Sequence, residues 1–402
     1  MIILLEYLQS LGMKIPMVFM YYSTRMMLAA LTSLLMCIFL GPRFIKKLYE
    51  MKIGQTIRTE ECPLLGKLHH NKKDTPTMGG ILILVSLVTS LFLWMDLRHP
   101  FTILLLLTTL FFGFLGGIDD YLKLRHKNTK GLSGKKKLLG QVFFSSLIAL
   151  YLLVPAFHPA SSAETQVITA EQIAGTEQIV AGKHREEIPL HQLAVSVYIP
   201  FFKGAVIHLS GPFIVLAFLL IVFVITGSSN AVNLTDGLDG LAAGCLIMVS
   251  VCFALIAFVS NHVDLAHYLN IPYIEGSGEV AIYLSAFAGG CLGFLWYNGY
   301  PAQVFMGDTG SLALGGILGV SAVLLKKELL LAIVGGIFVA ETLSVILQVA
   351  SYKLRNKKRI FLCSPLHHHF EYKGWPETKV VLRFWIVGFL LALIGLASLK
   401  FQ

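Results

Sequence analysis

The stretch Asn230-Ala-Val-Asn-Leu-Thr-Asp-Gly-Leu-Asp-Gly-Leu-Ala242 places two carboxylates and two amides between long apolar runs at 211–228 and 241–259. Burying such groups in a hydrocarbon environment costs several kcal/mol each. A chain that keeps them between two hydrophobic segments is expected to use them. Two further acidic sites, Asp119-Asp120 and Asp308, also lie where an apolar segment meets a polar one. This arrangement suggests a metal and phosphate site at a membrane surface.

The composition is that of a membrane protein. The chain has 402 residues, of which 55% are hydrophobic and 14% are charged, whereas soluble proteins carry about 25% charged residues. A bilayer core of roughly 30 Å needs about 20 apolar residues per helix. The apolar runs do not alternate with polar residues, as strands of a barrel would. We therefore expect an all-α integral membrane protein, one polytopic domain over residues 1–402, with about ten transmembrane helices. The ten segments lie near 17–41, 78–95, 101–118, 138–156, 211–228, 241–259, 281–296, 310–325, 329–351 and 380–399.

The basic residues predict the orientation. Segments 42–77, 119–137 and 352–379 carry eight, seven and seven of the 32 Lys and Arg residues. With ten helices these segments lie on one side, and the positive-inside rule assigns that side to the cytoplasm. Both termini then face outward, and all three acidic sites fall on the cytoplasmic side of a bacterial inner membrane. The net charge of +9 is mostly this bias, so nucleic-acid binding is not expected.

The segment 157–210 is predicted to lie outside the membrane as a periplasmic loop. Ser161–Glu187 is polar and of low complexity, and two β-rich runs flank Lys203-Gly204, which indicates a small hairpin. No chemistry is expected there. The first sixteen residues are predicted to form a short interfacial piece rather than a cleaved signal. The six cysteines show no paired spacing, so free thiols are expected.

Asp119-Asp120 ends the third apolar segment. Adjacent carboxylates repel each other, so both ionise readily only near cations. Mg²⁺ prefers carboxylate oxygens together with substrate phosphates. Lys123 follows four residues after Asp119, so one helix face can carry both. The alternative is a solvated helix end with an ion pair.

Asp308 lies in the glycine-rich stretch Asn298–Leu312. Gly307 and Gly310 allow the backbone to approach a ligand closely. The next helix is expected to begin at Ser311, and its amides would favour an anion. The alternative is a turn capped by Asp308.

Two features near the C-terminus carry candidate groups. Pro365-Leu-His-His-His-Phe-Glu371 is expected to be an irregular loop whose histidines contact phosphate. Zinc would need a wider ligand set with fixed spacing. Glu341 lies in the middle of an apolar segment, where an ionisable residue is a functional candidate. We favour a structural role instead, as a hydrogen bond between helices.

Together these motifs resemble the polyprenyl-phosphate N-acetylhexosamine-1-phosphate transferases. The resemblance covers most of the chain, in order, although the insertion at 157–190 is longer than the family pattern needs. The piece Pro365–Glu371 favours members that act on UDP-MurNAc-pentapeptide over those that use other sugars. The matching pieces are Thr75-Pro-Thr-Met-Gly-Gly, Asp119-Asp-Tyr-Leu-Lys, Gly131-Leu with Lys137 and Gln141, Asn230–Ala242, Asn298–Leu312 and Pro365–Glu371.

The resemblance implies the first membrane step of peptidoglycan synthesis. Undecaprenyl phosphate would attack the β-phosphate of UDP-MurNAc-pentapeptide, releasing UMP, with Mg²⁺ as cofactor and a homodimer as the plausible assembly. Asp308 and Asp119 would bind Mg²⁺, and Asp119, Asp120, Asp308 and His367 would form the catalytic group. Phe305 would stack on uracil. Lys135 could replace Lys137 in a neighbouring register. The substrate-binding residues would be Lys72, Thr77, Lys123, Lys137, Asn233, Asp236, Gly237, Leu238, Asp239, Asn298, Phe305, Gln348 and His368.

Two other functions stay open at this point. One is a related transferase that uses another UDP-N-acetylhexosamine, such as UDP-N-acetylglucosamine. The other is a secondary transporter, whose site would lie near the membrane midplane in repeated halves. No repeat of halves is visible here, and the polar clusters lie at predicted helix ends.

Overall fold

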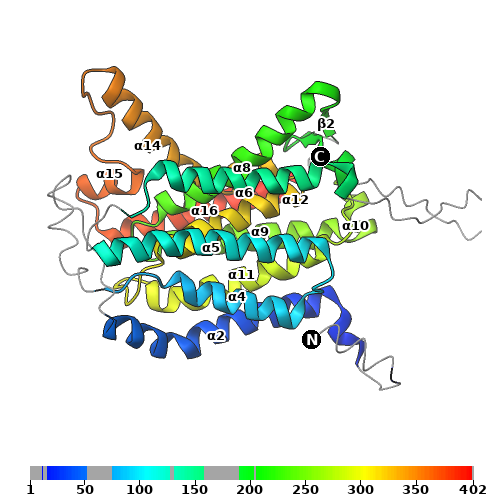
Figure 1. Ribbon diagram of the computed structural model, residues 1–402, viewed down its shortest axis with the longest axis horizontal. Coiled ribbons are helices and arrows are strands. Elements are labelled where there is room, and N and C mark those ends of the chain that lie inside the picture. Colours follow the sequence, from blue (N-terminus) through cyan, green and yellow to red (C-terminus); the bar gives the residue numbers. More distant parts are fainter. Residues whose placement is uncertain are drawn as a thin grey trace, which may run out of the picture.

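The computed structural model describes residues 11, 16–51, 75–126, 131–157, 190–202 and 205–400. Its helices run mostly along one common axis, as Figure 1 shows. The elements are η1 (Met17–Met20), α2 (Tyr22–Glu50), α4 (Gly80–Trp94), α5 (Pro100–His126), α6 (Gly134–Leu153), η3 (Pro155–Phe157), α7 (Leu190–Ala194), β1 (Ser196–Tyr198), β2 (Ala205–His208), η5 (Gly211–Phe213), α8 (Ile214–Thr235), α9 (Leu241–Ser260), α10 (Val263–Tyr268), α11 (Ser277–Asn298), α12 (Gly307–Leu324), α13 (Glu328–Val334), α14 (Gly336–Leu354), α15 (Leu366–Tyr372) and α16 (Glu377–Ser398).

The all-α membrane fold is confirmed. Within the described residues, nine helices are long and apolar enough to cross a bilayer. The remaining expected segment is α4, an apolar helix of 15 residues. At about 1.5 Å per residue, α4 is shorter than a bilayer core.

One segment differs from its expected form. The run 329–351 is two helices, α13 and α14, separated at Gly335. Two consecutive glycines at this point weaken the helix, because glycine loses the most backbone freedom on folding. Beyond the break, the end of α14 extends away from the bundle in Figure 1.

The centre of the bundle is formed by α11 and α12. In the apolar stretch of α12, 89% of the residues are buried, and in the apolar stretch of α11, 78% of the residues are buried. Helix α12 packs against α5 and α8, and α11 packs against α2 and α9. The deeply buried α12 therefore presents its first turn to both α5 and α8, which carry two of the acidic motifs.

The hairpin predicted near 195–209 is present. Strands β1 and β2 pair antiparallel, with Val197 opposite Ile207. In Figure 1 the hairpin lies at the opposite end of the bundle from α15. The expected tip, Lys203-Gly204, and the low-complexity part 161–187 lie outside the described residues.

Candidate active site

Three carboxylates meet where α5 and α12 cross. Oxygens of Asp119, Asp120 and Asp308 lie within 4.8 Å of one another. The two helices come very close here. A side chain at Gly116 of α5 would collide with the backbone of Asp308, so only glycine fits at this crossing. The expected boundaries need correction, since α5 continues past the acidic pair to His126 and α12 begins at Gly307 rather than Ser311. The pair is therefore within a helix, and Asp308 is in the first helical turn.

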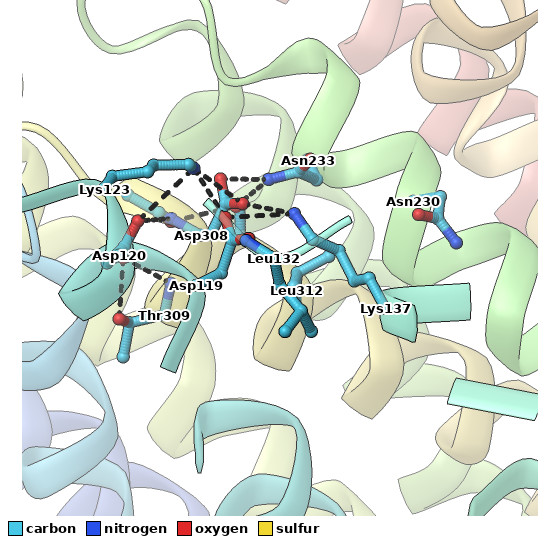
Figure 2. Close-up of polar contacts among 12 residues, drawn as sticks. Asp119, Asp120, Lys123, Leu132, Lys137, Asn230, Asn233, Asp308, Thr309 and Leu312 are labelled. Atoms are coloured by element: carbon cyan, nitrogen blue, oxygen red, sulfur yellow. Dashed lines mark hydrogen bonds and ion pairs between the residues drawn. The ribbon is translucent and has the colours of Figure 1, made fainter. Parts of the chain in front are cut away.

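Two lysines bind this carboxylate cluster. Lys137 Nζ on α6 lies 2.6 Å from Asp308 Oδ2 and 3.2 Å from Asp119 Oδ2. Lys123 Nζ on α5 lies 2.6 Å from Asp119 Oδ2 and 2.9 Å from Asp308 Oδ2. Figure 2 shows both ammonium groups pointing at Asp308 from different sides. The positive charges of the two lysines offset the repulsion between Asp119 and Asp120, so both carboxylates can lie within one helix.

Asn233 adds a neutral donor to the cluster. Its Nδ2 donates to Asp308 Oδ1 at 2.8 Å and to Ser311 Oγ at 2.9 Å. Asn233 lies in the last turns of α8, which stays helical to Thr235. Both oxygens of Asp308 are thus engaged, one by lysines and one by an amide.

Asp119 and Asp120 have different surroundings. Asp120 accepts hydrogen bonds from the Thr309 amide at 2.9 Å and the Thr309 hydroxyl at 2.7 Å. It also accepts from the Asp308 amide at 3.2 Å. These amides belong to the first turn of α12 and have no partner within that helix. Asp120 therefore caps α12 from a neighbouring helix.

Asp119 instead faces the lysines. Its Oδ1 accepts the Leu132 amide at 2.6 Å. Its buried Oδ2 faces the ammonium groups of Lys123 and Lys137, at 2.6 Å and 3.2 Å. This oxygen is therefore held by flexible lysine side chains, whereas Asp120 is held by backbone amides.

The cluster fits a divalent cation. Three carboxylates share the positive charge of two lysines, which leaves an excess of negative charge. Carboxylate oxygens are the ligands that Mg²⁺ prefers. Asp308 and Asp119 are the residues that would hold it, as the sequence suggested.

Asp236 continues the acidic surface beside the cluster. It accepts the Gly307 backbone amide, and burial raises the pKa of its carboxyl to about 7, with Asp308 and Asp120 acting in the same direction. Gly307 has a φ of +74°, and a side chain there would meet Asp120 and Thr77. Only glycine allows this turn to bring the predicted residues Thr77, Asp236 and Asp308 close to one another.

The histidine segment is a helix, not an irregular loop. His367 and His368 lie in α15. The ring of buried His367 packs against Gly237, and its Nδ1 lies 3.2 Å from Glu341 Oε2. Neither ring nitrogen of His367 makes a hydrogen bond of good geometry. The fold thus brings the histidines to the 236–240 loop.

Glu341 has the structural role that we expected. Its Oε1 accepts the His367 backbone amide at 3.1 Å. This bond joins α14 to the first turn of α15. His368 is held separately, with Nδ1 2.7 Å from Glu371 Oε2.

The predicted nucleotide-binding residues form a second group. Asp239 Oδ2 accepts the Ala302 amide at 2.9 Å, and Asn298 bonds both the Gly240 amide and the Val304 carbonyl. These buried side chains tie the 236–240 loop to the 299–306 loop. Leu238 is buried between them, whereas Phe305 is half-buried.

Two further predicted binding residues are Gln348 and Lys72. Gln348 uses its amide on segment 360–361, since its Oε1 accepts from Ile360 and Phe361 and its Nε2 donates to the Phe361 carbonyl. The structure therefore places it as a support of that segment. Lys72 lies outside the described residues.

Comparison with known proteins decides the family. The profile of glycosyl transferase family 4 matches residues 102–326. A signature described as phospho-N-acetylmuramoyl-pentapeptide-transferase signature 1 matches residues 72–84. A phospho-N-acetylmuramoyl-pentapeptide-transferase of Protochlamydia amoebophila (strain UWE25) is 63% identical over 99% of both chains.

The chain belongs to the phospho-N-acetylmuramoyl-pentapeptide transferases of glycosyl transferase family 4. The range matched by the family profile includes the three carboxylates of the cluster and both lysines. It ends before α15, so the histidines lie outside that range.

Two contributors to this transferase site were not predicted. Thr309 holds Asp120, and its place beside Asp308 in a helix-starting Gly-Asp-Thr-Gly sequence was the available signal. The Leu132 amide holds Asp119. The available signal was the Gly131-Leu piece of the resemblance, because a side chain at Gly131 would collide with Asp119.

Proposed function

We propose that this protein transfers phospho-MurNAc-pentapeptide from UDP-MurNAc-pentapeptide to undecaprenyl phosphate. The observation that carries this proposal is the cluster of three carboxylates and two lysines at one end of an apolar bundle. A lipid phosphate can reach such a site from the membrane surface, while a soluble nucleotide can reach it from water. The 63% identical relative carries the name of this activity.

The reaction is a phosphoryl transfer. An oxygen of the lipid phosphate forms a bond to the β-phosphorus of the donor, and the bond from that phosphorus to the bridging oxygen of UMP breaks. UMP leaves with the electron pair, and the new lipid carries a diphosphate. Any proton on the attacking oxygen must be removed. Such reactions need positioning and charge neutralisation more than covalent chemistry.

The different surroundings of the two adjacent carboxylates suggest different roles. Asp119 Oδ2 faces the ammonium groups of both lysines rather than backbone amides, so we assign Asp119 to accept the proton or orient the lipid phosphate. Asp120 is saturated by the first turn of α12. We assign Asp120 to fix the position of Asp308.

The cations of the site would act on the phosphates. Lys123 and Lys137 would move from carboxylates to phosphate oxygens, and the His367 and His368 rings would contact the diphosphate. Asp308 and Asp119 would hold Mg²⁺, which when bound neutralises charge on the transferring phosphate. Asn233 would keep Asp308 oriented through its Oδ1 bond.

The loops 236–240 and 299–306 would hold the uridine. Asp239 and Asn298 join these loops. We propose that half-buried Phe305 stacks on the base and that Lys72, Thr77, Gly237 and Leu238 complete the donor site. Gln348 would contribute by holding segment 360–361.

The membrane orientation follows from the charges. We propose that the site faces the cytoplasm from a bacterial inner membrane, because the basic segments 42–77, 119–137 and 352–379 follow or precede, in the sequence, the helix ends that carry the cluster. A homodimer is the proposed assembly.

Release of UMP tests the function directly. Protein purified in detergent, without any gradient, is supplied with undecaprenyl phosphate, Mg²⁺ and either UDP-MurNAc-pentapeptide or UDP-N-acetylglucosamine. We expect UMP only with the first donor, and loss of release on adding EDTA with recovery on excess Mg²⁺. Release only with UDP-N-acetylglucosamine would overturn the proposed substrate, and release with neither would overturn the proposed activity.

A further inference from the structure

A buried polar relay lies directly beneath the carboxylate cluster. Gln141 on α6 is fully buried, as is Ser145 one turn further along the helix. Its Nε2 donates to Ser229 Oγ at 3.1 Å, and its Oε1 accepts Asn230 Nδ2 at 2.7 Å. Ser229 Oγ in turn donates to the Leu312 carbonyl at 2.9 Å. One amide and one hydroxyl thus connect α6, α8 and α12.

The relay has the same register as the site on all three helices. Gln141 follows Lys137 by four residues, Ser229 precedes Asn233 by four, and Leu312 follows Asp308 by four. A four-residue step is about one helical turn, or about 6 Å along the axis. The relay is therefore a second polar layer one turn below the layer in which Lys137 and Asn233 bind Asp308.

We propose that Gln141 is a positioning residue for the transfer reaction, which sets the register of α6 and α8 against α12 so that Lys137 and Asn233 meet Asp308. This inference rests on the proposed function. The ammonium group of Lys137 lies at the end of a long, flexible side chain. Where it can reach therefore depends on where α6 is held. Misplacement by about 1 Å can cost about a hundredfold in rate.

The physical basis is the cost of breaking the relay in an apolar setting. Replacing Gln141 by an apolar residue leaves Ser229 and Asn230 with one fewer partner each. A buried polar group without a partner is unfavourable, because it has lost its bonds to water and gained none in the protein. The helices are expected to shift to recover such bonds, and that shift displaces Lys137.

The first experiment compares Gln141→Met with a matched control. Ser90 is also fully buried and joins two helices, because its Oγ donates to the Ala29 carbonyl at 3.0 Å, but it contacts no residue of the cluster. We expect Gln141→Met to lower kcat for UMP release by about 10- to 100-fold. The KM for UDP-MurNAc-pentapeptide should stay within about twofold, because the uridine that anchors the donor is held by the loops 236–240 and 299–306, which the relay does not contact. Ser90→Ala should keep the kcat of the wild type.

A double-mutant cycle separates positioning from general stability. If Gln141 acts through Lys137, Gln141→Met should add little further loss of kcat in a Lys137→Met background. A purely structural role would lower the melting temperature and leave the two kinetic effects additive. Ser229→Ala is the second variant, which removes the middle of the relay and keeps the Gln141 amide.

The outcomes are distinct. Wild-type kcat in folded Gln141→Met, or full additivity with Lys137→Met, would overturn the inference. If Gln141→Met does not fold, Ser229→Ala decides: a reduced kcat with unchanged donor KM supports positioning, and wild-type kinetics contradicts it. If the wild-type protein releases no UMP, the proposed function fails instead, which is a separate result.

Discussion

Buried charges occur at both ends of the bundle, but they are arranged differently. At the end opposite the cluster, Arg25 Nη2 lies 2.7 Å from Glu279 Oε1. Arg25 Nε donates to the Trp94 carbonyl at 2.7 Å, and Glu279 Oε2 accepts the Asp96 amide at 3.1 Å. One cation meets one anion, and both have further hydrogen bonds. This pair joins α2, α4 and α11.

The carboxylate cluster lacks that balance. Three carboxylates face only two lysines, and both lysines share Asp308 Oδ2 and Asp119 Oδ2. Leaving a buried charge without a matching partner is costly unless a ligand supplies one. The comparison teaches that a charge-balanced pair holds helices together, whereas a cluster with an excess of negative charge is suited to bind a cation.

The strongest test of this contrast is Asp308→Asn. The substitution keeps the shape but removes the charge that both lysines share, so turnover should be abolished while the protein stays folded in the membrane. UMP release and the melting temperature are measured on the same sample. Metal-dependent turnover near that of the wild type would break the comparison.

Glu279→Gln is the reciprocal change at the other end. It leaves the Arg25 charge buried without its partner, which typically costs about 3–5 kcal/mol. We expect a clear drop in the thermal stability and unchanged kcat for the protein that remains folded. A loss of kcat at unchanged stability would place this pair in the catalytic machinery and contradict the contrast.

The roles of the adjacent carboxylates Asp119 and Asp120 can be distinguished by kinetics and thermal stability in the same way. Asp119→Asn and Asp120→Asn should each lower kcat by at least about a hundredfold. Only Asp120→Asn should also lower the melting temperature, because it weakens the hydrogen bonds to the first turn of α12. Kinetics and thermal unfolding of both variants are compared. If both variants keep more than half of the activity, the pair is only a helix-stabilising feature.

The donor site gives a smaller effect. Base–aromatic stacking is worth roughly 1–3 kcal/mol, so Phe305→Ala should weaken use of the nucleotide donor by about five- to a hundredfold. KM is measured for each substrate separately. An effect confined to undecaprenyl phosphate would refute stacking on uracil, and an equal effect on both would indicate that Phe305 only packs the loop.

The smallest expected effect concerns Lys327, near the hairpin. Burial lowers the pKa of its ammonium group to about 8, from 10.5. Between these two values the unfolded state binds more protons than the folded state, so stability should rise with pH. In Lys327→Met this rise should disappear from melting curves taken between about pH 8 and 10.5. An unchanged rise would assign it to another group.

The sequence by itself determined the membrane fold and pointed to the candidate residues of the site. Hydrophobic length is a local property, and in lipid every backbone group must be bonded within its own helix, so composition predicts spans reliably. The acidic pair, Asp308 and the histidines were also visible, because charged residues beside apolar runs are rare.

Only the tertiary structure decided which of these residues contact one another and which role each has. Lys137, and not its neighbour Lys135, reaches Asp308, a residue that is 171 positions away. Asp120 caps α12 while Asp119 faces the lysines, although the two are adjacent in sequence. The acidic pair and the histidines are helical because Lys123, Lys137 and Glu341, two of them on other helices, supply the missing partners. Such contacts depend on which helix faces meet, and local patterns do not encode that.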